Sequence, residues 1–483
     1  MVLNENPALL LPQNPEEVEQ GAESNMSISH YNQDTGQVNM DAHEGLRGIA
    51  ALWIMLFHCF VYSTYPIDFM GSSLMPLFFI LSGFTLTICY HKLNPTEHEI
   101  VNDKALADPK NSILSFYNNR IVRVAPVYFA MNFALALPLW NYGYMAAPNI
   151  AASAGSIVTT ATFTSTLFGF ILGSPLDGPS WTVQTFMFLW IYFPISLQRV
   201  RKLEPQHLKS WITYLYYIQM IILFVTFYTL LPYLGFWPAF CFSTMNPLSR
   251  YPLFLMGVYG GEILYRVSKD KIDLLEIWPK SFLGSCFSSC YDNINLNTGN
   301  NRYEPGIDSP HNNVRETYWT RRAHRLAFGL LFVFISLATF DRIVKNLTGD
   351  SSATIGAFIW LQAAVPLAQL ELIVTLAVIS KNSILYKTLT TRVSKFFGTI
   401  SMTIYLIHFP IIKYVCFAQN NWQTLIWPSA ADWLEPNNAL VKNYIEKNKL
   451  SLWGIPIVVG ITIPLAAVVF YAYEEPIRRR FKN

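Results

Sequence analysis

Two long stretches of the chain contain no charged residue, and they decide what kind of fold it can adopt. Residues 124–176 and 210–249 lack Asp, Glu, Lys and Arg. A helix needs about 20 mostly apolar residues to cross the hydrocarbon core of a bilayer, so each stretch is long enough to cross it. Over the whole chain 52% of residues are hydrophobic and 13% are charged, whereas soluble domains carry about 25% charged residues. The sequence therefore predicts an all-α, polytopic bundle of membrane helices.

Counting the apolar segments and orienting the basic loops predicts the topology. The segments lie near 46–65, 70–90, 124–142, 156–172, 180–198, 211–233, 247–265, 324–341, 354–379, 396–416 and 452–472. The loop 91–123 and the residues after the fifth segment are rich in Lys and Arg, so both are expected on the cytoplasmic side. An even number of crossings must separate them, so one of the three intervening segments does not cross. We expect the hydroxyl-rich 156–172 stretch to be re-entrant or interfacial, which leaves about ten transmembrane helices.

This topology places both termini in the cytoplasm and divides the chain into a tail and a membrane domain. Residues 1–43 are polar and acidic, as expected of a disordered tail. The membrane domain is predicted to span 44–480, with a cytoplasmic insertion at 266–323. The sequon Asn346-Leu-Thr348 falls on the outer side, which favours a secretory membrane, either plasma membrane or endomembrane. The net charge of +3 needs no nucleic-acid partner to explain it, and lipids are the expected surroundings.

His58 is the residue most suggestive of chemistry, because it lies within the uncharged run 48–67. A titratable side chain inside a membrane helix marks a functional site unless it only bonds a neighbouring helix. Arg47 precedes it by eleven residues, almost three helical turns, so both lie on nearly the same face and about 16 Å apart along the axis. Alone, Arg47 is also explained as an anchor that extends to the membrane interface.

The two side chains together suggest group transfer from a phosphorylated carrier. Burial favours the neutral imidazole, so His58 can accept a proton from a hydroxyl group. The guanidinium of Arg47 is a planar fork that suits phosphate oxygens. The pair does not identify the transferred group.

Further polar residues are predicted at similar depths of the membrane. His408 is about as far from the cytoplasmic edge as His58, whereas Glu371 and Glu474 lie in or near the inner half. Carboxylates in such positions are often held in structural ion pairs. Arg120 and Arg123 lie at the same inner level, where positive-inside anchoring also explains them. The six cysteines lack the spacing of metal ligands or of a disulfide framework, so we predict neither a metal nor a bound cofactor.

A series of short motifs resembles the acyltransferase type three family of integral membrane proteins. The motifs occur in family order over residues 44–480, and each alone is weak. They are Glu44-Gly-Leu-Arg47 with His58, Pro76-Leu-Phe-Phe-Ile-Leu-Ser82-Gly83-Phe84, Phe116-Tyr117-Asn-Asn-Arg120-Ile-Val-Arg123, Arg250-Tyr-Pro-Leu-Phe-Leu-Met-Gly257, the block from Ser401 to Pro410, and Glu474-Glu-Pro476.

The resemblance implies a ten-helix enzyme that moves an acyl group, typically acetyl, from acyl-coenzyme A to a hydroxyl of a carbohydrate or lipid-linked acceptor. It implies that His58 and Arg47 are essential, with His58 as base or acyl relay and Arg47 as the clamp on the carrier. The substrate-binding candidates are Arg120, Arg123, Trp181, Ser82, His408, Glu474 and Glu371.

The chain departs from the family pattern at one position. The family often shows Trp-Ser-Leu-x-x-Glu, but here Trp181 is followed by Phe186 at the glutamate position. Either Asp177 or Gln184 replaces that carboxylate, or the acceptor differs, or the activity is altered. Two other functions therefore stay open: a proton-coupled transporter that uses His58, His408 and Glu371, and a catalytically silent sensor of acyl-coenzyme A.

Overall fold

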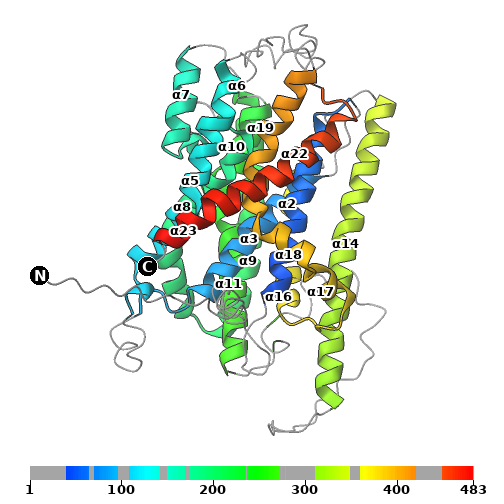
Figure 1. Ribbon diagram of the computed structural model, residues 1–483. Coiled ribbons are helices and arrows are strands. Elements are labelled where there is room, and N and C mark those ends of the chain that lie inside the picture. The colour runs from blue at the N-terminus through cyan, green and yellow to red at the C-terminus, as the bar shows by residue number, and fades with distance from the viewer. Residues whose placement is uncertain are drawn as a thin grey trace, which may run out of the picture.

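The computed structural model describes residues 40–64, 70–95, 108–141, 150–168, 175–234, 236–270, 274, 278, 310–348, 359–419 and 449–481. These residues are almost entirely helical, and they contain no β-strand beyond a single bridge between Ser63 and Leu450. Figure 1 shows a bundle of long helices, with the oblique α22 (Gly454–Val469) crossing in front of the others. The predicted all-α fold class is confirmed.

Seven of the described helical stretches are long and apolar enough to cross a membrane. They are Asp41–Val61, Gly71–Cys89, Ile113–Leu139, Pro205–Leu234, Tyr318–Phe340, Ser401–Gln419 and Gly454–Arg480. Two further helices are long but carry charges, α8 (Trp181–Arg201) and α11 (Pro247–Asp270). The protein is therefore an integral membrane protein, and the count of ten crossings stays a prediction.

The segment expected to be re-entrant does not form a helix of membrane length. Helix α7 (Ile150–Ala161) has 12 residues, so it extends over only about 18 Å. Phe163 then adopts a positive φ of 59°, and a short 3-10 turn, η6 (Ser165–Phe168), follows. The many hydroxyl groups here satisfy backbone carbonyls, as in the bond from Thr162 to Val158.

The ends of the predicted domain and insertion differ slightly from the helices. Helix α2 (Asp41–Val61) begins inside the predicted tail, and residues 1–39 lie outside the described residues. Helix α11 continues to Asp270, and α14 (Pro310–Thr348) begins before the predicted insertion ends. Both ends of the 266–323 insertion are therefore helical, and most of its middle lies outside the described residues.

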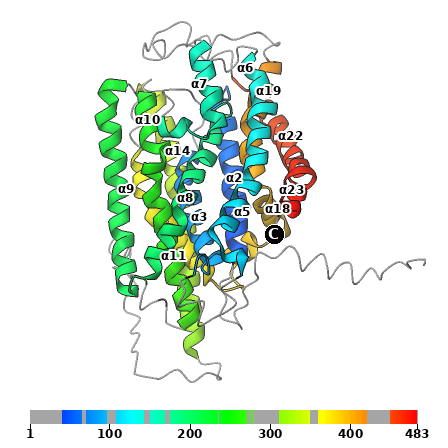
Figure 2. The ribbon, with the colours of Figure 1, turned by 90° about the vertical axis from the view of Figure 1, so that its left-hand side faces the viewer.

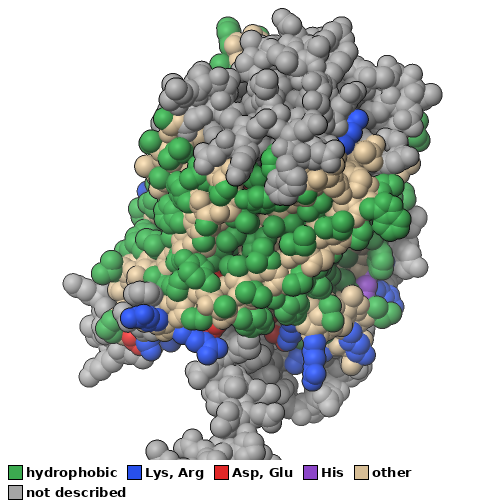
Figure 3. All heavy atoms as spheres, turned by 45° about the horizontal axis from the view of Figure 1, so that its top comes forward, with side chains coloured by type: hydrophobic (Ala, Val, Ile, Leu, Met, Phe, Trp, Pro, Cys, Tyr) green, Lys and Arg blue, Asp and Glu red, His purple; other side chains and the backbone are tan. Residues whose placement is uncertain are grey.

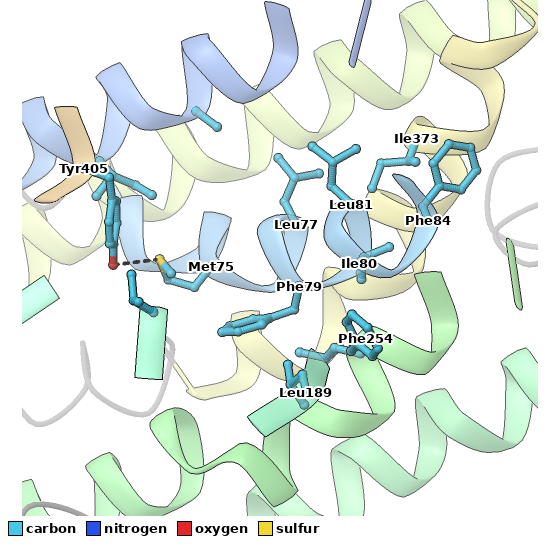
Figure 4. Packing of buried hydrophobic residues seen from close by; sticks show 14 of the residues in the cluster. Met75, Leu77, Phe79, Ile80, Leu81, Phe84, Leu189, Phe254, Ile373 and Tyr405 are labelled. Atoms are coloured by element: carbon cyan, nitrogen blue, oxygen red, sulfur yellow. Dashed lines mark hydrogen bonds between the residues drawn. The ribbon is translucent and has the colours of Figure 1, made fainter. Parts of the chain in front are cut away.

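The centre of the bundle is the contact between α3 (Met75–Cys89) and α11. Gly83 faces the Phe254 carbonyl and Gly257 faces the Ile80 carbonyl so closely that a Cβ atom at either glycine would overlap the opposite backbone. Small residues allow membrane helices to approach in this way, where packing replaces the hydrophobic effect as the source of association. Figure 4 shows Phe79, Ile80 and Phe84 of α3 beside Phe254, within one continuous apolar core.

Two helices at the periphery present apolar side chains outward. Helix α9 (Pro205–Leu234) stands at one edge in Figure 2, and α14 stands at one side in Figure 1. Tyr217 and Ile221 of α9, like Phe328 and Phe332 of α14, are exposed. In Figure 3 an apolar belt covers the visible face, and Lys and Arg side chains gather along its lower edge. We call this edge the basic end of the bundle.

Candidate active site

His58 of α2 contacts His408 of α19 (Ser401–Gln419) in the middle of both helices. The Nε2 atom of His408 lies 2.9 Å from Nδ1 of His58, and the ring centroids are 5.0 Å apart. His408 is fully buried, whereas His58 is partly accessible. The structure therefore joins two histidines that the sequence placed only at similar depths.

The hydrogen bonds of this pair determine where its protons lie. Nδ1 of His408 is 3.1 Å from the carbonyl oxygen of Ile404, which can only accept, so this nitrogen carries the hydrogen. In the neutral pair Nε2 of His408 is then an acceptor, and Nδ1 of His58 donates to it. The remaining nitrogen, Nε2 of His58, holds a lone pair. His58 can therefore act as a base at Nε2 while His408 fixes its tautomer.

Aromatic side chains surround the histidine pair. Phe57 and Phe409 lie with ring centroids 4.9 Å and 5.9 Å from that of His58. The ring of Tyr405 is 5.8 Å from that of His408. An apolar wall lowers the local dielectric constant and strengthens the hydrogen bond between the rings.

The side chain of Arg47, at the basic end of α2, is held by a backbone carbonyl group of a neighbouring helix. Its Nε and Nη2 atoms donate to the Gly398 carbonyl at 3.3 and 3.0 Å, near the end of α18 (Arg392–Thr399). Gly48 lies so close to Gly398 that a Cβ atom there would overlap the backbone of α18. The glycine next to Arg47 is thus what allows its guanidinium to reach this carbonyl.

Three arginines from three chain segments lie near Arg123, and we call the four residues the basic cluster: Arg47, Arg120, Arg123 and Arg478. Arg47, Arg120 and Arg478 repel the charge on Arg123, and Glu474 attracts it. Arg120 donates to the Tyr90 hydroxyl at 2.7 Å, while its buried Nε has no hydrogen-bond partner among the described residues.

Glu474 is the buried carboxylate of this region. It accepts a hydrogen bond of 2.9 Å from Thr403 and lies in a π-helical turn, η8 (Phe470–Glu474). It also attracts both Arg47 and Arg123. Glu44 also attracts Arg47, and Glu475 forms an ion pair with Arg478. Three carboxylates thus face four guanidinium groups, and this excess of positive charge suits an anionic ligand such as a phosphate.

Three other predicted site residues are engaged in packing or pairing. Glu371 of α16 (Pro366–Ala377) forms an ion pair with Arg322 of α14. Ser82 accepts a hydrogen bond from the indole nitrogen of Trp190 at 3.3 Å, and Trp181 packs 6.1 Å from Phe79. Their roles in substrate binding stay predictions. The transporter hypothesis requires a continuous path through His58, His408 and Glu371. The structure instead pairs Glu371 with Arg322, apart from the histidine pair.

A second group of polar side chains lies beside α19, next to the start of α8. Asn132 accepts hydrogen bonds from the backbone N–H of Asp177 at 2.9 Å and from the hydroxyl of Ser180 at 3.2 Å. Gln184 donates to the Tyr128 hydroxyl at 2.9 Å. We call Asn132, Asp177, Ser180, Gln184 and Tyr128 the amide cluster.

The position at which the family often has a glutamate holds an aromatic side chain within an aromatic stack. Phe186 lies 4.8 Å from Phe79 and 5.6 Å from Trp190. The guanidinium carbon of Arg250 lies 5.6 Å from the centroid of the Phe79 ring. Residue 186 therefore carries no carboxylate, and the two residues considered as its replacement, Gln184 and Asp177, both belong to the amide cluster.

Sequence reasoning missed Asn132 and Lys413. Asn132 lies in the π-helical stretch η5 (Ala130–Ala136), whose backbone the sequence did not reveal. Lys413 is buried, with its Nζ atom 4.0 Å from the Tyr62 ring centroid and 5.3 Å from that of Phe409. A lysine in the segment 396–416, which contains no other Lys, Arg, Asp or Glu, was a usable signal, because a charged side chain inside a membrane helix marks a candidate functional site.

Comparison with protein families agrees with the resemblance to acyltransferases. A family model described as an acyltransferase domain matches residues 40–471. No curated protein and no solved structure matches the chain. The matched range contains both histidines, Arg47, the amide cluster and most of the basic cluster.

Proposed function

Because the chain belongs to the acyltransferase type three family, and is thus a membrane acyltransferase, we propose that it transfers an acyl group from acyl-coenzyme A to a hydroxyl group. The acyl group is expected to be acetyl, and the acceptor a carbohydrate or a lipid-linked molecule. The observation that carries the proposal is the hydrogen bond between His58 and His408, which leaves a basic nitrogen in an apolar setting.

The reaction follows from the protons of this pair. Nε2 of His58 takes the proton of the acceptor hydroxyl while the oxygen attacks the thioester carbonyl and a new C–O bond forms. The C–S bond then breaks, and the leaving thiolate takes the proton back from His58. The products are an ester and free coenzyme A, and the histidine returns to its initial state.

The basic cluster is proposed to hold the donor. Its arginines are suited to the phosphates of coenzyme A, since guanidinium groups bind phosphate oxygens in pairs. The pantetheine arm would then extend from this end of the bundle toward His58. Such an arm accounts for the separation of about 16 Å between Arg47 and His58 along α2.

The test is acyl transfer by purified protein. Wild type is incubated with radiolabelled acetyl-coenzyme A and a membrane extract as the source of acceptor, beside His58→Ala, Arg47→Ala and the control His207→Ala, which changes an exposed histidine. We expect labelled ester from wild type and the control alone. Equal transfer by all four proteins, or none by wild type, would contradict the proposal.

Two further measurements, of acetyl-coenzyme A binding and of flux into liposomes, separate the two alternatives. A silent sensor would bind acetyl-coenzyme A without producing ester. A transporter would give proton-coupled flux in liposomes that contain no acyl donor.

A further inference from the structure

The amide cluster contains buried oxygen atoms that no described residue satisfies. Both carboxyl oxygens of Asp177 and the Oε1 atom of Gln184 lack a hydrogen-bond partner among the described residues. Asp177 and Gln184 are themselves fully buried. Buried polar atoms are nearly always paired, so three such atoms in one cluster indicate that a ligand completes it.

The backbone around Asp177 is fixed although its side chain is unpaired. Its N–H donates to Asn132, and its carbonyl accepts from the Ser180 N–H at 3.0 Å and the Ser180 hydroxyl at 2.7 Å. Asn132 in turn donates to the Tyr128 carbonyl at 2.9 Å. A rigid backbone that presents an unpaired side chain is the arrangement of a preorganised binding site.

The cluster adjoins the histidine pair. A Cβ atom on Gly178, the residue after Asp177, would lie 3.2 Å from the ring of Phe409, and that ring is the one beside His58. The Tyr405 hydroxyl is hydrogen-bonded to Thr182 and lies within electrostatic range of Asp177, and the Tyr405 ring is next to His408. A molecule bound at the cluster is therefore close to the proposed base.

The unpaired atoms also indicate the chemistry of that molecule. Burial raises the pKa of Asp177 well above its ordinary value, so the carboxyl keeps its proton and both donates and accepts. The Gln184 oxygen only accepts. Neighbouring hydroxyl groups supply donors and acceptors to match, whereas an anionic group would face acceptor oxygens and a single alcohol would leave them unpaired.

We propose that Asp177 and Gln184 bind neighbouring hydroxyl groups of a carbohydrate acceptor, while His58 takes the proton from the hydroxyl that is acylated. This inference rests on the proposed function and chooses the carbohydrate over a simple lipid alcohol.

Two acceptors with the same alkyl chain test the inference. Octyl β-glucoside offers several hydroxyl groups and 1-octanol offers one, and each is supplied with acetyl-coenzyme A to wild type, Asp177→Ala, Asp177→Asn and Gln184→Leu. The matched control is Gln219→Leu, which changes a buried glutamine of α9 that also has an unpaired Oε1 and bonds the Gln362 carbonyl.

We expect wild type and the control to prefer the glucoside. Asp177→Ala and Gln184→Leu should each raise the KM for the glucoside roughly tenfold, as the loss of one neutral hydrogen bond does. Both should leave the KM for acetyl-coenzyme A and the rate with octanol unchanged. Asp177→Asn retains a donor and an acceptor, so it should stay close to wild type.

Each other result overturns one of the two proposals. Equal use of both acceptors by wild type, or variants that match the control, overturns the acceptor site. So does acylation of the membrane extract without acylation of either probe. Failure to acylate the extract and both probes overturns the proposed function itself. A thermal melt adds a readout of structure, because a purely structural Asp177 would make Asp177→Ala less stable, whereas loss of an unpaired carboxyl should not.

Discussion

The basic cluster includes Arg47 of α2 and the amide cluster lies beside α19, the two helices that carry the histidine pair, yet the clusters are built from opposite kinds of side chain. The first gathers guanidinium groups around a single buried carboxylate, Glu474. The second has amides, hydroxyls and the carboxyl of Asp177. A charged region suits phosphates and a neutral one suits hydroxyl groups, so the contrast divides donor from acceptor. The two regions are thus expected to respond to different changes.

The largest effect is expected where the two regions meet. His58→Ala removes the proposed base and should lower turnover by about 100- to 10,000-fold. Because His58 belongs to neither cluster, the KM values for acetyl-coenzyme A and for the acceptor should both stay within about threefold of wild type. Steady-state kinetics with each substrate varied in turn measure this. A selective rise of one KM would assign His58 to that side instead.

A smaller effect is expected at the partner of the base. His408→Phe removes the acceptor of the His58 N–H and frees the tautomer, so turnover should fall by about 100-fold. His408→Asn should recover part of that loss, because its side-chain oxygen can accept the same hydrogen bond. Single-turnover transfer from labelled acetyl-coenzyme A measures the chemical step. Equal loss in both variants would mean that His408 fills space rather than orients His58.

The basic cluster should affect the donor alone. Arg123→Gln removes one charge-assisted contact with phosphate, which is expected to raise the KM for acetyl-coenzyme A by roughly 10- to 100-fold. The KM for the acceptor should not change. The control is Arg392→Gln, an exposed arginine at the start of α18. A similar rise of this KM in both variants would point to general electrostatic attraction. Increasing salt would then remove the rise over wild type in both.

The smallest effect concerns stability and the protonation of Asp177. Burial raises its pKa in the folded protein, whereas the unfolded chain has the ordinary value of about 3.9. The folded state therefore holds the proton more tightly, and stability falls as pH rises from about 4 toward the folded pKa. Asp177→Asn should remove this dependence, so that its melting temperature exceeds that of wild type at pH 7 and equals it near pH 4. Thermal melts in detergent at both pH values measure this. If Asp177 were ionised in the folded protein, the melting temperatures of Asp177→Asn and wild type would differ by the same amount at both pH values.

Much of the fold could be predicted because the membrane restricts the choices. Backbone groups in hydrocarbon must be bonded internally, so uncharged runs such as 210–249 become helices. The short α7 was predictable from the hydroxyl groups of 156–172. The number of crossings was harder, because α8 ends at Arg199 and Arg201, and α11 contains Glu262 and Arg266. Charged residues near the ends of such helices lower their mean hydropathy, and they do not show at which residue a helix leaves the membrane.

The site was predicted in part, for a different reason. Arg47 and His58 share one helix, so their spacing alone relates them. The contact between His58 and His408 joins residues separated by 350 positions, and only the packing of α2 against α19 creates it. Glu371 looked like a site residue by depth, but its ion pair with Arg322 depends on where α14 stands. The sequence showed which polar side chains lie at a given depth of the membrane, but it did not show which residues they contact.

The two π-helical stretches add a constraint that concerns the length of the chain rather than its composition. η5 carries Asn132 of the amide cluster, and η8 carries Glu474 beside the basic cluster. A π-helical turn holds one residue more than an α-helical turn, so the extra residue is taken up locally and the helix beyond it keeps its face. A residue added to or removed from a regular part of either helix would instead rotate everything beyond it by about 100°. Every side chain that the sites require would still be present but would face another direction, so such a one-residue change is expected to be more harmful than most substitutions.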